Sequence, residues 1–120
     1  MNTFSLKDLR FNPFPPPIKG GREFSKNPKE VFLKIEDILC HYALGNISYE
    51  HALQALNYAK NAIIPKLSYS QNIKEELINI YNEAIVLLKK LRTKDKVKEW
   101  LLSNGPPRKS FKSLDLFLKN

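Results

Sequence analysis

The sequence predicts an all-α protein, a small antiparallel bundle of three main helices with a short fourth helix. Large apolar residues recur at intervals of three and four over long stretches, and the alternation typical of strands does not occur. Residues that begin and end helices separate these stretches. We expect helices over residues 28–44, 48–64, 70–92 and 95–103.

The parts outside the helices also have a recognisable organisation. We expect residues 1–26 to form an extended proline-rich arm and residues 27–104 to form the helical bundle. Residues 105–120 begin at a Gly-Pro-Pro break and are expected to be a basic C-terminal tail that ends in a short helix.

The arm combines prolines with large apolar side chains. Prolines at positions 13, 15, 16 and 17 lack amide donors and favour a polyproline II conformation over a helix or an inner strand. The same segment holds Phe4, Leu6, Leu9, Phe11 and Phe14, which are too many large apolar groups for a freely solvated tail. The arm is therefore expected to lie across a surface, either that of its own bundle or that of a partner.

The first two helices have clear boundary residues. Asn27 suits the N-cap and Pro28 the first helical position, and Gly45 supplies the residue that ends the helix. Ser48 caps the second helix, which cannot continue through Pro65. A connection this short places the two helices side by side in opposite directions.

The third helix has the longest uninterrupted apolar pattern and is expected at the centre of the bundle. Ile78 and Ile85 add a second apolar edge, which indicates neighbours on two sides. Val97, Trp100 and Leu101 form the buried side of the short fourth helix. The predicted core consists of Ile35, Ile38, Leu53, Leu77, Ile80, Ala84 and Leu87.

The positive charge of the chain is concentrated near its C-terminus. The formal net charge is +8, and residues 89–120 contain 10 Lys and Arg against 3 Asp and Glu, whereas residues 1–88 contain 10 against 9. Such clustering attracts a polyanion through Coulomb steering and counterion release. We therefore expect a nucleic-acid backbone to bind at Lys89, Lys90, Arg92, Lys94, Lys96, Lys98, Arg108 and Lys109. A solvated face that keeps the protein in solution is the alternative.

The sequence argues against an enzyme. Cys40, His41 and His51 are the only Cys and His residues, and neighbouring helical positions point about 100° apart. There is no glycine-rich phosphate loop, and no Arg precedes either histidine at the spacing typical of helical HEPN nucleases. We expect no catalytic residue, metal, cofactor or small-molecule substrate.

The sequence also lacks the features of membrane and secreted proteins. No apolar run approaches the ~20 residues that cross a bilayer. The N-terminus has no basic start followed by an apolar stretch, and a single cysteine forms no internal disulfide. We expect a cytoplasmic protein without membrane contact.

The last residues have the pattern of a short amphipathic helix. Leu114, Phe117 and Leu118 fall on one face of a helical turn. Residues 111–118 resemble the clamp-binding peptide of archaeal and eukaryotic proteins that bind the PCNA sliding clamp. Here Phe111 stands where that peptide has Gln, and a leucine replaces its second aromatic residue. The resemblance implies a sliding clamp as partner; another protein, or the fourth helix of the same chain, would bind the same face.

Two classes of function are consistent with these features. The first is a non-enzymatic accessory or architectural protein of a nucleic-acid complex, such as a replication or repair accessory, or a component of a ribosome or virion. The second is a protein-interaction adaptor or self-assembling structural subunit without nucleic-acid contact.

Overall fold

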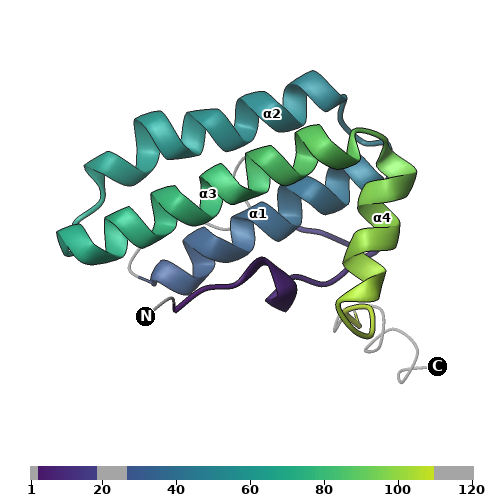
Figure 1. Ribbon diagram of the computed structural model, residues 1–120, viewed down its shortest axis with the longest axis horizontal. Helices are drawn as coiled ribbons and strands as arrows, with labels where there is room; N and C mark the ends of the chain where they lie inside the picture. The colour runs from purple at the N-terminus through teal and green to yellow at the C-terminus, as the bar shows by residue number, and fades with distance from the viewer. Residues whose placement is uncertain (1–2, 19–26, 110–120) are drawn as a thin grey trace.

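Figure 1 shows the computed structural model of the protein, which describes residues 3–18 and 27–109. These residues form a compact, all-helical structure that contains no strand. Its four α-helices are α1 (Pro28–Ala43), α2 (Tyr49–Tyr58), α3 (Gln71–Leu91) and α4 (Lys94–Ser103). The all-α class expected from the sequence is confirmed.

Each α-helix begins at a side chain that accepts a hydrogen bond from the backbone two or three residues later. Asn27 accepts from Lys29 N at 3.0 Å, and Ser48 caps α2 in the same way. Ser70 caps α3 and Thr93 caps α4. Because capping depends on nearby residues, the predicted helix starts agree with the observed ones to within one residue.

The second helix differs from the prediction in its last part. The α-helical segment ends at Tyr58, and the chain continues as a π-helical turn (Ala59–Ile63) and a 3-10 turn (Ile64–Lys66). Pro65 lies in the first turn of this last segment, where its missing amide needs no partner. Ala59 at the start of the π turn and Ile64 just after it are both buried in the core.

The core lies among α1, α2 and α3, and α4 runs across one end of these helices (Figure 1). Of the predicted core residues, Ile35, Ile38, Leu77, Ile80 and Ala84 are buried. Leu53 is only partly buried but packs against this core, whereas the prediction is wrong for Leu87, which is partly buried outside it.

Residues 3–18 lie against the helices of the same chain. Leu9 and Phe11 are buried, and the ring of Phe4 stacks on Phe32 with the centroids 5.0 Å apart. A short 3-10 turn, Leu6–Asp8, interrupts the extended course of the segment. Phe14 is not part of this packing, because 61% of its surface remains exposed.

Candidate nucleic-acid interface

The link between α3 and α4 is two residues long and is fixed by contacts to α1 and α2. Arg92 has a φ of 69°, in the left-handed region that a side chain rarely adopts. Its amide donates to Leu88 O at 2.8 Å, and its carbonyl accepts a hydrogen bond from the hydroxyl of Tyr42. Its guanidinium lies 5.4 Å from the ring centroid of Tyr49, within the range of a cation–π interaction. These contacts set the angle at which α4 leaves α3.

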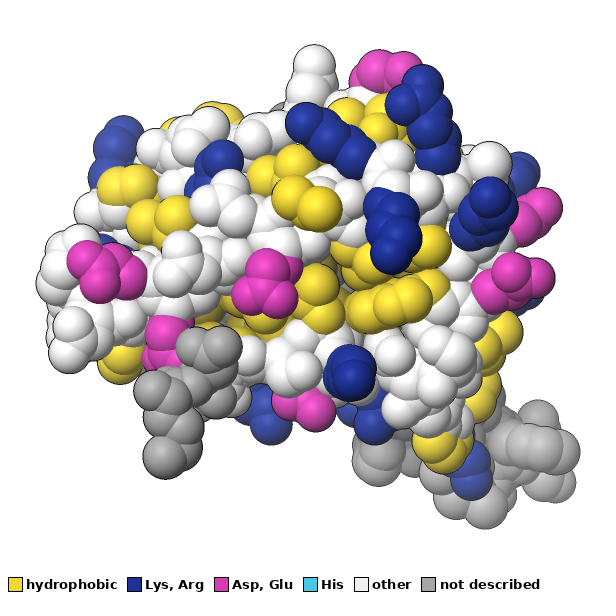
Figure 2. Space-filling view, in the orientation of Figure 1, with side chains coloured by type: hydrophobic (Ala, Val, Ile, Leu, Met, Phe, Trp, Pro, Cys, Tyr) yellow, Lys and Arg dark blue, Asp and Glu magenta, His cyan; other side chains and the backbone are white. Residues whose placement is uncertain are grey.

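Six of the eight predicted cations lie on this link or on the two helices that it joins, Arg92 in the link and the other five in α3 and α4. All six are exposed to solvent: Lys89, Lys90, Arg92, Lys94, Lys96 and Lys98. Within residues 89–103 they are accompanied by only two acidic residues, Asp95 and Glu99. Figure 2 shows Lys and Arg side chains around the end of the molecule where α4 lies.

The lysines of α4 fall on two flanks of that helix. Lys94 and Lys98 are four residues apart and share one flank, on which Lys98 Nζ lies 5.2 Å from the ring centroid of Phe11. Lys96 shares the other flank with Trp100, again four residues away. The cations therefore form a band around the corner between α3 and α4, not one flat face.

The structure gives Arg108 a different partner from the one expected. Its guanidinium pairs with Glu36, Nη2 to Oε1 at 2.9 Å, and the carboxylate is only 1% exposed. The amide of Arg108 also donates to Phe11 O at 2.8 Å. Arg108 therefore joins the end of the helical region to α1 and the arm, whereas the neighbouring Lys109 is exposed.

The charged residues of α1 had no assigned role in the sequence prediction. Glu36 and Asp37 are both buried, and Glu36 accepts a hydrogen bond from Arg10 N at 2.8 Å. Glu36 is covered by the arm, through Arg10, and by Arg108. The large apolar residues of the arm predicted that it lies across a surface, of its own bundle or of a partner, but they did not indicate which helix it covers.

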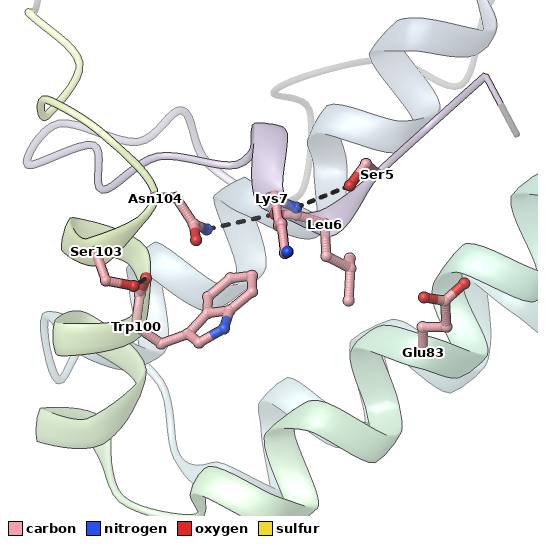
Figure 3. Close-up of a pocket in the computed structure, with 7 residues that line it drawn as sticks. All are labelled: Ser5, Leu6, Lys7, Glu83, Trp100, Ser103 and Asn104. Atoms are coloured by element: carbon pink, nitrogen blue, oxygen red, sulfur yellow. Dashed lines mark hydrogen bonds between the residues drawn. The ribbon is translucent and has the colours of Figure 1, made fainter.

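A pocket lies between the arm, α3 and α4, as Figure 3 shows. The arm contributes Ser5–Lys7, α3 contributes Glu83, and the end of α4 contributes Trp100, Ser103 and Asn104. Sequence reasoning missed this pocket, because it exists only once the arm has packed beside α4. Trp100, expected to be a core residue, is half-buried.

The predicted partner-binding residues of the tail, Leu114, Phe117 and Leu118, lie outside the described residues.

The only cysteine of the chain is buried, and its surroundings make the thiol unreactive. Asn12 N donates to the Cys40 sulfur at 3.2 Å, and the thiol lies 3.5 Å from Arg10 O. Burial raises the pKa of Cys40 to about 12, so the thiolate is scarce at neutral pH.

His41 Nε2 lies 2.8 Å from Pro16 O and thus contacts the arm. Among residues 3–18 and 27–109, no group of three His, Cys, Asp or Glu side chains is arranged to hold a metal.

The free energy of unfolding is expected to fall as the pH rises from about 9 to about 12. A cysteine exposed by unfolding loses its proton near its ordinary pKa of 9.0, whereas the buried thiol keeps its proton until about 12. The unfolded state then binds fewer protons, so alkaline pH favours unfolding. Burial also raises the pKa of Tyr81, which acts in the same direction. Urea denaturation at several pH values measures this effect. Cys40→Ala is the control and should make the fall in stability less steep, because only the contribution of Tyr81 remains; an equally steep fall in the control would contradict the prediction.

No helix within the described ranges is both long and apolar enough to span a membrane.

Models of known protein families, curated proteins and solved structures were compared with the chain, and none of them matches it.

Proposed function

We propose that the protein is a non-enzymatic accessory protein of a nucleic-acid complex, and that it binds the phosphate backbone at the corner between α3 and α4. The observation that supports this most strongly is the band of six exposed cations on two helices and the fixed link between them. Cations held in place in this way bind phosphates without ordering a flexible segment first.

The proposed interface consists of Lys89, Lys90, Arg92, Lys94, Lys96 and Lys98, with Lys109 as a further contact. Arg108 is left out, because its guanidinium is occupied by Glu36. In this proposal α1, α2 and α3 act as an antiparallel bundle that supports the corner, and the proline-rich arm holds the bundle and α4 together. Asp95 and Glu99 reduce the positive potential only in part.

A protein partner at the tail belongs to the same proposal. Leu114, Phe117 and Leu118 have the spacing of a clamp-binding peptide, and they follow a basic region that would already lie near nucleic acid. A protein that touches both nucleic acid and a sliding clamp would serve as a replication or repair accessory. This part of the proposal depends on the sequence alone.

Binding to nucleic acid is expected to weaken steeply with salt. Release of counterions from about five phosphate contacts gives a slope of roughly −4 in log affinity against log salt, which is at least a 100-fold loss between about 50 and 200 mM salt. Fluorescence anisotropy of a labelled oligonucleotide measures this slope directly. If no binding is found at about 50 mM salt, the proposal fails and the adaptor function, without nucleic-acid contact, takes its place.

A further inference from the structure

We propose that the pocket beside Trp100 receives one unpaired nucleobase, so that the protein binds single strands in preference to duplexes. This inference builds on the nucleic-acid binding proposed above and adds the form of nucleic acid that is recognised. It depends on the pocket in Figure 3, which the cation band by itself does not require.

The walls of the pocket are held in place by hydrogen bonds. Asn104 Nδ2 donates to Leu9 O at 3.0 Å and lies 3.4 Å from Leu6 O, which ties the arm to the end of α4. Ser5 Oγ accepts from Lys7 N, and Ser103 Oγ donates to Trp100 O at 2.6 Å. The pocket has a volume of about 570 Å³, which lies within the ~300–1,000 Å³ typical of small-ligand sites.

Trp100 provides a surface on which a base can stack. Its indole is half-buried against the core and also lines the pocket (Figure 3). Proteins that bind single strands stack bases on aromatic side chains, and a base inside a duplex is not free to do so. A stacked base would therefore have to be unpaired.

The charges around the pocket favour a base inside it and phosphates at its edge. Glu83 lines the pocket, and its carboxylate repels a phosphate but accepts hydrogen bonds from the N–H groups of a base edge. Guanine offers two adjacent donors of this kind, and in a duplex they are used for base pairing. Lys7 lies at the pocket, Lys96 shares the flank of Trp100, and Lys90 lies two helical turns after Glu83. These lysines can bind the phosphates on either side of the inserted base.

Intrinsic fluorescence tests the inference directly, because Trp100 is the only tryptophan of the chain. A single-stranded oligonucleotide is expected to quench this fluorescence, whereas a duplex of the same sequence should bind with little quenching. We expect the single strand to bind at least about 10-fold more tightly, since stacking of one base on an aromatic residue contributes a factor of this order.

Variants separate stacking from charge. Trp100→Leu should weaken single-strand binding by about 10-fold and leave duplex binding unchanged, while Trp100→Phe should keep most of the affinity. Labelled oligonucleotides report binding for these variants, and circular dichroism checks that they are folded. Glu83→Gln changes an exposed residue and is expected to reduce the preference for guanine over other bases at the inserted position. This variant keeps Trp100, so it tests the pocket even if the tryptophan variants fail to fold.

The possible outcomes distinguish this inference from the proposed function. Equal binding of single strand and duplex, with unchanged fluorescence, would overturn the base pocket and leave the backbone interface intact. The base pocket would also be overturned if Trp100→Leu lost affinity equally for the single strand and for the duplex. Quenching of the Trp100 fluorescence by a peptide but not by an oligonucleotide would overturn it as well. Absence of any nucleic-acid binding at low salt would overturn both proposals.

Discussion

Arg108→Ala is expected to lower the free energy of unfolding by about 3 kcal/mol. The change leaves the Glu36 carboxylate, which is 1% exposed, without the cation that compensates its charge. Breaking a buried ion pair from one side costs roughly 3–5 kcal/mol, and the lower end applies because 42% of the Arg108 side chain is exposed. Thermal denaturation should show a decrease in melting temperature of roughly 10 °C or more.

Two further variants test whether this loss comes from the ion pair. Lys109→Ala changes the adjacent exposed residue and should alter stability by less than about 0.5 kcal/mol. Adding Glu36→Gln to Arg108→Ala removes the uncompensated charge and should restore part of the lost stability. A melting temperature for Arg108→Ala within a degree or two of the wild type would show that the pair contributes nothing to folding.

The Glu36–Arg108 pair also has a consequence for the proposed interface. It connects α1 to the residue that follows the Gly-Pro-Pro break, and Arg10 N donates to the same carboxylate. One buried acidic group thus holds both the arm and the segment after α4. The arm in turn forms one wall of the Trp100 pocket, so a loss of this pair would affect the pocket as well as the stability.

Helix positions could be predicted from the sequence because their causes are local. Caps such as Ser48 and Thr93 act on the backbone two or three residues away, and the apolar repeat shows which face is buried. The π turn at Ala59–Ile63 could not be predicted in this way, since one extra residue per turn barely changes the apolar pattern. Ile64, which follows that turn, is fully buried.

The candidate site could be predicted only in part. The exposure of the lysines in α3 and α4 follows from the helical repeat, so it could be predicted from the sequence alone. The role of Arg108 depends on Glu36, which lies 72 positions away along the chain. The pocket beside Trp100 depends on the arm, whose path over α1 and α4 is a matter of tertiary packing. Contacts of this kind leave no local pattern in the sequence.

The most direct test of the proposed function compares two charge-reversal variants with equal net charge. Lys90→Glu with Lys96→Glu changes the proposed interface, whereas Lys29→Glu with Lys66→Glu changes exposed lysines outside α3, α4 and their link. Each pair lowers the formal net charge from +8 to +4. Any difference between the variants therefore reflects where the charge lies and not how much there is.

The affinity of both variants for a labelled oligonucleotide at about 50 mM salt is the decisive measurement. A unit charge about 4 Å from a phosphate contributes ~1 kcal/mol in water, and each reversal replaces such an attraction by a repulsion. The change at Lys90 and Lys96 therefore amounts to about 4 kcal/mol and should weaken binding by roughly 1,000-fold. The change at Lys29 and Lys66 should weaken it by no more than about 5-fold through the overall potential. This result would assign the nucleic-acid contact to the corner between α3 and α4. Equal losses in the two variants, or no loss in either, would contradict it.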